Sequence, residues 1–145
     1  MNILYKTSAT ATGGRNGNVK SETESLDVAV RTPESLGGPK GDYLNPEILF
    51  AGGYAACFDS ALNLVIKNKK VNTGITSTTA HVQLGKTEAG GFGLAVTLEV
   101  NIPGVDQETA QTLVETAHQV CPYSNATRGN IEVFLEVSTN EVVKA

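Results

Sequence analysis

The chain has 145 residues, a length that predicts one domain over residues 1–145 with room for a substantial hydrophobic core. Hydrophobic residues make up 40% of the sequence and charged residues 18%, which is a globular composition and excludes a disordered chain. The formal net charge of -4 argues against nucleic acid as a partner, because phosphate binding needs clustered Lys and Arg.

The first half of the chain predicts three strands and a long helix. Residues 2–12 and 17–24 are rich in Thr and Ser and flank Gly13-Gly-Arg-Asn-Gly17, which is typical of a hairpin turn. A third strand is expected over residues 27–31. Residues 32–44 contain two prolines and several glycines, so we expect an irregular loop, long enough to suspect a function such as a lid.

The long helix is predicted from residue 46 to about residue 69. Asn45 suits the N-cap, Pro46 the first helical position and Glu47 the first turn. The helix is apolar around most of its circumference, which predicts burial on most sides. One chain of this size has little material to cover such a helix, which hints at a second subunit.

The second half predicts two alternating strands, over residues 80–84 and 94–102, joined by a turn at 88–92. A second helix begins at the Asp106 cap and ends near Cys121, where Pro122 stops it. A last strand covers residues 131–137. The order βββαββαβ indicates an α+β fold with helices packed on a mainly antiparallel sheet.

No targeting or membrane-spanning segment is expected. The N-terminal residues lack the long apolar stretch of a signal peptide. The longest weakly polar run, residues 48–58, is shorter than the roughly 20 residues that span a bilayer. We therefore expect a soluble, cytoplasmic protein without membrane contacts. In that reducing compartment a cysteine pair is more often catalytic, redox-sensing or metal-binding than a structural disulfide, although two unrelated buried thiols stay possible.

The two cysteines are the first candidates for chemistry. Cys57 lies in the long helix among small residues, which leave space beside the sulfur; a tight helix contact explains the same pattern. Cys121 lies where a helix turns into a polar segment, so its thiol can move without unfolding a core, although ordinary core packing also explains it.

Two charged residues and two histidines complete the candidates. Arg15 stands between glycines at the hairpin tip, where it either reaches into a pocket or is simply solvated. Glu47 in a first helical turn needs no role beyond the helix dipole. His81 and His118 with the two cysteines would make four metal ligands, but no CxxC or HxxxH spacing exists. We expect no metal and no bound cofactor.

Three strings together resemble the organic hydroperoxide resistance (Ohr) family of the OsmC-like superfamily. They are Gly13-Gly-Arg-Asn-Gly17, Asn45-Pro-Glu-Ile-Leu-Phe-Ala-Gly-Gly-Tyr-Ala-Ala-Cys-Phe58 and Val120-Cys-Pro-Tyr-Ser-Asn-Ala-Thr-Arg-Gly-Asn130. The resemblance covers essentially the whole chain, and the third string favours the Ohr branch over its OsmC sister branch.

The resemblance implies a peroxidase that reduces organic hydroperoxides, including fatty-acid ones. It implies Cys57 as the peroxidatic cysteine, Cys121 as the resolving cysteine, and Arg15 with Glu47 as supporting residues. It also implies an intertwined homodimer with active sites at the interface, and reduction by lipoyl groups on proteins or by dihydrolipoamide. A broader OsmC-type peroxidase, a redox sensor that forms the same disulfide, and a non-catalytic binding protein are the alternatives.

Chemistry and helix geometry add two expectations. A free cysteine is mostly protonated at neutral pH, so Arg15 should stabilise the thiolate, and Glu47 should hold the guanidinium in a bidentate pair. Glu47 and Cys57 lie about 15 Å apart along a straight helix and about 80° apart around it. Either the helix bends sharply at Gly52-Gly53 or the other subunit supplies Glu47, and we predict the second. An apolar wall that favours alkyl chains is expected from four aromatic residues, although plain core packing explains each of them equally well: Phe50, Tyr54, Phe58 and Phe92.

Overall fold

The computed structural model describes residues 1–141, in which the chain divides into two compact units. The first comprises residues 1–49, and the second begins at residue 50. Each unit contains one three-stranded sheet, and the helices accompany the second sheet. The α+β class and the order of the predicted elements are confirmed, with additions described below.

The N-terminal unit is built on the antiparallel sheet β1-β2-β3, formed by Ala9–Thr12, Asn18–Ser21 and Asp27–Ala29. The predicted hairpin is present, and a 3-10 turn, η1 at Gly14–Asn16, fills its tip. A Cβ atom on Gly17 would lie 1.7 Å from the carbonyl oxygen of Thr12, so only glycine fits there.

The first strand is shorter than predicted. Residues 2–8 lie outside β1, because β2 ends at Ser21 and the chain turns there to begin β3. The last ladder contact on this side is the bond from the Glu22 amide to the Ser8 carbonyl. Residues before Ser8 therefore extend past the end of their partner strand.

The 32–44 segment is irregular, as predicted, apart from a 3-10 turn, η2 at Glu34–Leu36. Its two ends meet, since Val30 and Leu44 form a parallel bridge. The Arg31 guanidinium lies over the Tyr43 ring, 5.6 Å from the centroid, and this cation–π contact ties the loop base together. A lid function for the segment stays a prediction.

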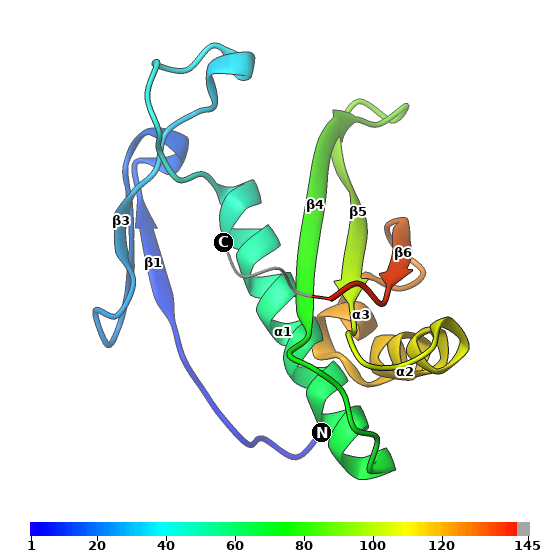
Figure 1. Ribbon diagram of the computed structural model, residues 1–145. Coiled ribbons are helices and arrows are strands. Elements are labelled where there is room, and N and C mark those ends of the chain that lie inside the picture. Colours follow the sequence, from blue (N-terminus) through cyan, green and yellow to red (C-terminus); the bar gives the residue numbers. More distant parts are fainter. Residues whose placement is uncertain (142–145) are drawn as a thin grey trace. The chain divides into compact units, whose positions relative to one another are not determined.

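The second unit packs helices against the sheet β4-β5-β6, as Figure 1 shows. Its strands are Ser77–Lys86, Phe92–Asn101 and Val133–Ser138, and its helices are α2, Gln107–Val120, and α3, Pro122–Thr127. β4 and β5 are antiparallel, whereas β5 and β6 are parallel. The sheets are thus mainly antiparallel, as predicted, and the β5–β6 pair is parallel because α2 and α3 carry the chain back to the starting end of β5.

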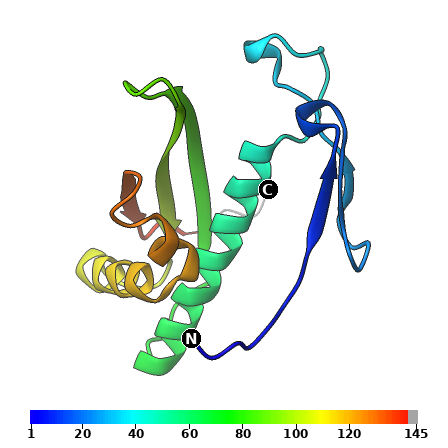
Figure 2. The ribbon, with the colours of Figure 1, turned by 180° about the vertical axis from the view of Figure 1, so that it is seen from behind.

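Helix α1, Pro46–Lys69, supplies the centre of the core. Figures 1 and 2 both show it alongside the β4–β5 pair. Its Tyr54, Phe58 and Leu62 are fully buried, together with Leu98 of β5 and Val114 of α2. The Asn45 side chain caps the helix by accepting a hydrogen bond from the Ile48 amide at 2.8 Å, as predicted.

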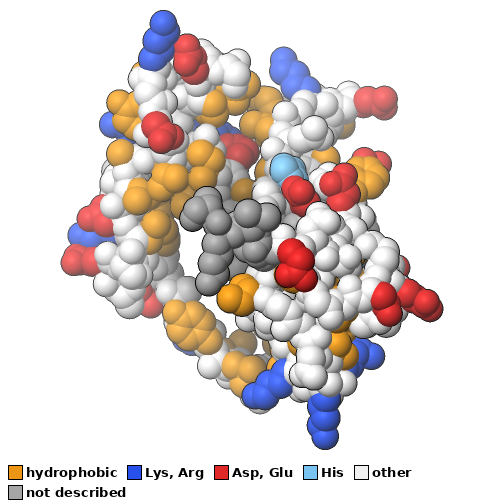
Figure 3. All heavy atoms as spheres, viewed as in Figure 1, with side chains coloured by type: hydrophobic (Ala, Val, Ile, Leu, Met, Phe, Trp, Pro, Cys, Tyr) orange, Lys and Arg blue, Asp and Glu red, His pale blue; other side chains and the backbone are white. Residues whose placement is uncertain are grey.

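Outside the core, α1 also carries exposed apolar side chains: Leu64 is 50% exposed and Ile48 46% exposed. By length and composition α1 could also cross a membrane, but its buried side belongs to the core of this fold. On the face shown in Figure 3, the Lys and Arg side chains of the described residues stand in separate small groups.

Candidate functional site

The sulfurs of the two free cysteines lie 3.6 Å apart. Cys57 projects from α1, whereas Cys121 occupies the junction between α2 and α3. Cys121 is fully buried and Cys57 is half-buried, so an external molecule reaches Cys57 first. A disulfide needs a sulfur separation of about 2 Å, so a small displacement of either side chain would close the bond.

Local helix chemistry places Cys121 at this junction. Asp106 caps α2 by accepting from the Thr109 amide at 2.7 Å, as predicted. At the other end, the Cys121 amide bonds to Ala117, while Pro122 has no amide hydrogen to continue the ladder. The Cys121 carbonyl then accepts from the Asn125 amide and starts α3. One residue therefore serves as the end of one helix and the start of the next.

A cavity of about 430 Å³ opens beside Cys57. Small side chains of α1 leave this space free, which is the arrangement that the sequence around Cys57 predicts. Beyond the sulfur and one hydroxyl, its walls are aliphatic, and its lining residues are Cys57, Ser60, Ala61, Leu64, Val120 and Pro122. The cavity thus presents a thiol at an apolar surface.

The four aromatics predicted to form this wall lie elsewhere in the described chain. Tyr54 and Phe58 are wholly inside the core. Phe50 packs against the core and meets the Tyr54 ring edge-on, with centroids 5.9 Å apart. Phe92 is 73% exposed at the start of β5. Aliphatic residues form the cavity wall instead of these aromatics, because they follow Cys57 by one or two helical turns or flank Cys121. A substrate-binding role for the aromatics stays a prediction.

The surroundings of Cys57 within its own unit favour the neutral thiol. Burial raises the pKa of Cys57, and the neighbouring Cys121 raises it further. A hydrogen bond from the Tyr123 backbone amide acts in the opposite direction but does not outweigh burial. A nucleophilic thiolate at this position therefore requires an additional positive charge.

Arg15 and Glu47 form a bidentate ion pair within the N-terminal unit. The guanidinium of Arg15, on η1, donates to both carboxylate oxygens of Glu47, at 2.8 and 2.5 Å. These hydrogen bonds lower the pKa of Glu47 and raise the pKa of Arg15. The predicted pairing is present, and it fixes the plane of the guanidinium, whose side chain is 35% exposed.

Comparisons with known proteins identify the family of the chain. The sequence profile of the OsmC-like protein family matches residues 39–136. The organic hydroperoxide resistance protein of Xanthomonas axonopodis pv. citri is 50% identical over 137 residues, which are 94% of this chain and 96% of the relative. The protein OhrA of Bacillus subtilis is 48% identical, over 93% of this chain and 96% of its own.

A solved structure extends the match to the fold. The organic hydroperoxide resistance protein of Elizabethkingia anophelis, crystallised with bound thiocyanate, superposes with a TM-score of 0.94 at 65% identity. The alignment covers 97% of this chain and 100% of that one. The chain belongs to the Ohr family of OsmC-like proteins. The resemblance inferred from its three motifs is therefore confirmed.

One polar cluster of this Ohr-family chain escaped the sequence analysis. Tyr54, Ser124 and Thr127 join their hydroxyls in the core, and His118 bonds to Ser124. The cluster was not predicted because helix α3 was not predicted. Ser124 and Thr127 are three residues apart, so they share a face only when residues 122–127 are helical.

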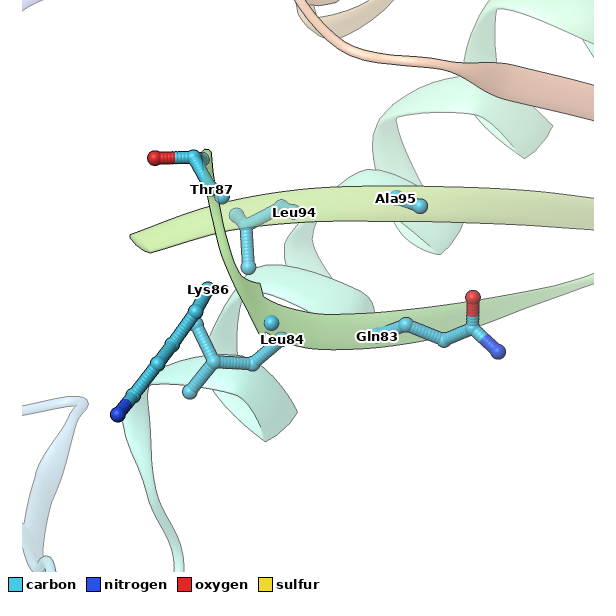
Figure 4. A pocket seen from close by; sticks show the side chains of 8 residues that line it. Gln83, Leu84, Lys86, Thr87, Leu94 and Ala95 are labelled. Carbon is cyan, nitrogen blue, oxygen red and sulfur yellow. The ribbon is translucent and has the colours of Figure 1, made fainter. Parts of the chain in front are cut away.

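Other features of the Ohr-family chain lie apart from the cysteines. His81 is exposed on β4 and pairs with Glu99 at 2.8 Å. Across residues 1–141 no three His, Cys, Asp or Glu side chains are grouped to hold a metal ion. A shallow hollow of about 600 Å³ lies at the β4–β5 hairpin, where Figure 4 shows Gln83 and Lys86 extending from β4 with Leu84 between them. Without a thiol or histidine among its lining residues, this hollow offers no redox chemistry.

Proposed function

We propose that the protein is a thiol-dependent peroxidase that reduces organic hydroperoxides, with Cys57 as the attacking thiolate and Cys121 as the resolving thiol. One observation carries the proposal: two free cysteine sulfurs 3.6 Å apart, the more exposed of which opens onto an apolar cavity. Membership of the Ohr family, whose relatives bear the name organic hydroperoxide resistance protein, supports the substrate class.

The proposed reaction has two steps on the protein. The Cys57 thiolate attacks the terminal oxygen of ROOH, the O–O bond breaks, and the products are a Cys57 sulfenic acid and an alkoxide that takes up a proton to become ROH. The Cys121 thiol then attacks the sulfenic sulfur, which forms the Cys57–Cys121 disulfide and releases water. The peroxide is reduced by two electrons, and the two thiols are oxidised.

The proposed source of positive charge is Arg15. Its guanidinium would stabilise the Cys57 thiolate and then the negative charge that develops on the peroxide oxygens. Glu47 would orient the guanidinium, as its bidentate contact allows. The burial that raises the pKa of Cys57 makes such a partner necessary for attack at neutral pH.

We also propose that the active protein is a homodimer in which the other subunit supplies Arg15 and Glu47. Helix spacing separates Glu47 from the Cys57 of its own chain by about 15 Å, which is too far for a shared contact. Val30 is the one residue of the described N-terminal unit that is fully buried, so this unit has little core of its own. A second chain would cover this unit.

A lipoyl-type dithiol is the proposed reductant. One of its thiolates would attack the Cys57–Cys121 disulfide, and its second thiol would close the lipoyl ring and return both cysteines to thiols. The aliphatic walls of the cavity suit an alkyl hydroperoxide and a lipoyl chain alike, because burying apolar surface contributes about 25 cal/mol per Å². Hydrogen peroxide gains nothing comparable there. We propose that this chemistry takes place in the cytoplasm.

Mass spectrometry after one equivalent of cumene hydroperoxide tests the proposal. We expect a Cys57–Cys121 disulfide in the wild type, and a dimedone-reactive sulfenic acid at Cys57 in Cys121→Ser. Steady turnover with dihydrolipoamide, lost in Cys57→Ser, separates an enzyme from a redox sensor or a binding protein. Equal rates with cumene hydroperoxide and hydrogen peroxide would instead indicate a broader OsmC-type peroxidase, and an unmodified Cys57 would refute the proposal.

A further inference from the structure

A continuous chain of hydrogen bonds runs through the core beside Cys121. The Tyr54 hydroxyl lies 2.8 Å from Ser124 Oγ and 3.1 Å from Thr127 Oγ1, and His118 Nδ1 lies 2.8 Å from Ser124 Oγ. Tyr54 and Ser124 are fully buried, and Thr127 is 6% exposed. Every buried side-chain polar atom in the described part of the chain has a partner, so this cluster is completely satisfied.

Counting donors gives the chain of bonds a direction. When the Thr127 hydroxyl donates its single proton to the Ser124 carbonyl at 3.2 Å, it accepts from Tyr54. In that arrangement Tyr54 accepts from Ser124, and Ser124 accepts from the Nδ1–H of His118. The bonds run head to tail from His118 to the Ser124 carbonyl, an order in which each bond polarises the next.

The residues that form these hydrogen bonds lie close to both cysteines in the sequence. His118 lies in the last turn of α2, before Cys121, while Ser124 and Thr127 lie on α3, after it. Tyr54 lies on α1, three residues before Cys57. The Tyr54 hydroxyl thereby joins α1, which carries Cys57, to α2 and α3, which lie before and after Cys121. A phenylalanine would fill the same core volume without making this connection.

A second contact holds the same segments together. A Cβ atom on Gly53 would lie 3.3 Å from Cε2 of the Tyr123 ring, so the ring rests directly on the α1 backbone. The Tyr54 and Tyr123 rings also meet at 6.0 Å between centroids. The start of α3 is thus seated on α1 within one turn of Cys57.

We propose that Tyr54 is a positioning residue for the resolving step, and that its hydroxyl keeps the Cys121 sulfur within bonding range of Cys57. The inference rests on the proposed function and assigns Tyr54 a role different from the substrate contact that its sequence position predicts. The physical basis is proximity: a thiol held beside its target reacts as if at very high local concentration, and a looser segment loses that advantage. The hydroxyl touches neither sulfur, so its effect should fall on closure of the disulfide and not on the first attack.

Ellman's reagent measures the two events separately and without peroxide. The Cys57 thiolate attacks the aromatic disulfide, which leaves a Cys57 mixed disulfide and releases one thionitrobenzoate anion. The Cys121 thiolate then attacks the Cys57 sulfur, which forms the Cys57–Cys121 bond and releases a second anion. Stopped-flow absorbance at 412 nm resolves both releases, and Cys121→Ser identifies the first.

Tyr54→Phe is expected to slow the second release by at least about tenfold while the first changes by less than about threefold. Thr76→Val is the matched control, because Thr76 is also buried and its hydroxyl also bonds to α1, through Asp59, from the residue before β4. We expect this control to change neither release. An unchanged or faster second release in Tyr54→Phe, or equal slowing in Thr76→Val, would overturn the inference.

A second pair of variants keeps the test decisive if Tyr54→Phe folds poorly. Thr127→Val removes one hydroxyl of the chain of bonds and should slow closure, whereas Thr127→Ser retains the hydroxyl and should restore it. Failure of the proposed function is recognised differently: the wild type would release two anions with Ellman's reagent yet leave alkyl hydroperoxides intact. Normal peroxide turnover with equal closure in wild type and Tyr54→Phe would refute the positioning role alone.

Discussion

The guanidinium of Arg15 is held by both oxygens of the Glu47 carboxylate, at 2.8 and 2.5 Å. The hairpin tip that carries Arg15 and the first turn of the helix that carries Glu47 are thus joined by two parallel hydrogen bonds. Bidentate geometry fixes the orientation of a guanidinium as well as its position. If this pair serves Cys57, removing either member should alter the thiolate and not only the fold.

Arg15→Gln should lower kcat/KM for cumene hydroperoxide by about 10²-fold, a loss typical of removing one charge-stabilising donor. Glu47→Gln should cause a smaller loss, because the guanidinium stays charged but is no longer oriented. In a Cys121→Ser background, thiolate absorbance at 240 nm should show a higher pKa for Cys57 in both variants.

Lys20→Gln provides the control for these variants. Lys20 belongs to the same unit and pairs with Glu24 at 2.9 Å, but both side chains are largely exposed. Removing this pair should leave the reaction rate and the Cys57 pKa unchanged. An unaltered Cys57 pKa in Arg15→Gln would show that the charge comes from another group.

The same pair predicts how stability depends on pH. Arg15 lowers the pKa of Glu47 below its ordinary value of 4.5, so the folded state favours the carboxylate. Its contribution is present above the unfolded pKa and is lost as pH falls through the lower folded pKa. In urea unfolding at fixed protein concentration, wild type should lose stability relative to Glu47→Gln as pH falls below 4.5, the ordinary pKa of the carboxyl group. Parallel curves for the two proteins would contradict the prediction.

The cavity wall predicts substrate selectivity. Leu64 lines the cavity beside Cys57, so Leu64→Asn should lower kcat/KM for cumene hydroperoxide by about tenfold through lost apolar contact. Hydrogen peroxide, with no alkyl group, should react within about twofold of the wild-type rate. Ile75→Asn is the control, since Ile75 is 87% exposed and does not line the cavity. Equal losses for the two peroxides would place the organic group elsewhere.

Local signals in the sequence were sufficient for the elements but not for the way they pair. The Asn45 and Asp106 caps and the hairpin at Gly13–Gly17 were predictable because each depends on a few adjacent residues. Helix α3 was missed because Pro122 ends α2, and the same proline is equally suited to the first position of a new helix. The parallel β5–β6 pair depends on a crossover whose direction no local pattern specifies.

In the candidate site, too, local features could be predicted from the sequence and features that depend on packing could not. The space beside Cys57 could be predicted from its small neighbours, and the Arg15–Glu47 pair from the chemistry of the two groups. The sulfur separation could not, because it depends on how α1 packs against the α2–α3 junction, 64 residues away along the chain. The aliphatic wall was missed because two of its members flank Cys121 and meet α1 only in the folded unit.

His118 yields a prediction that nuclear magnetic resonance can test directly. Burial lowers the pKa of His118 below its ordinary value of 6.5, and the nearby Arg128 lowers it further. The chain contains only two histidines, and His81 is exposed, so His81→Gln leaves a single imidazole to titrate. We expect His118 to titrate below the ordinary histidine pKa of 6.5 and, when neutral, to carry its proton on Nδ1, where it donates to Ser124. The folded state therefore resists protonation, so stability should decline as pH falls from about 6.5 toward the lower folded pKa. That decline should be absent in His118→Gln, whereas a neutral Nε2–H tautomer in the nitrogen spectrum would contradict the direction of the bonds through Ser124 and Tyr54.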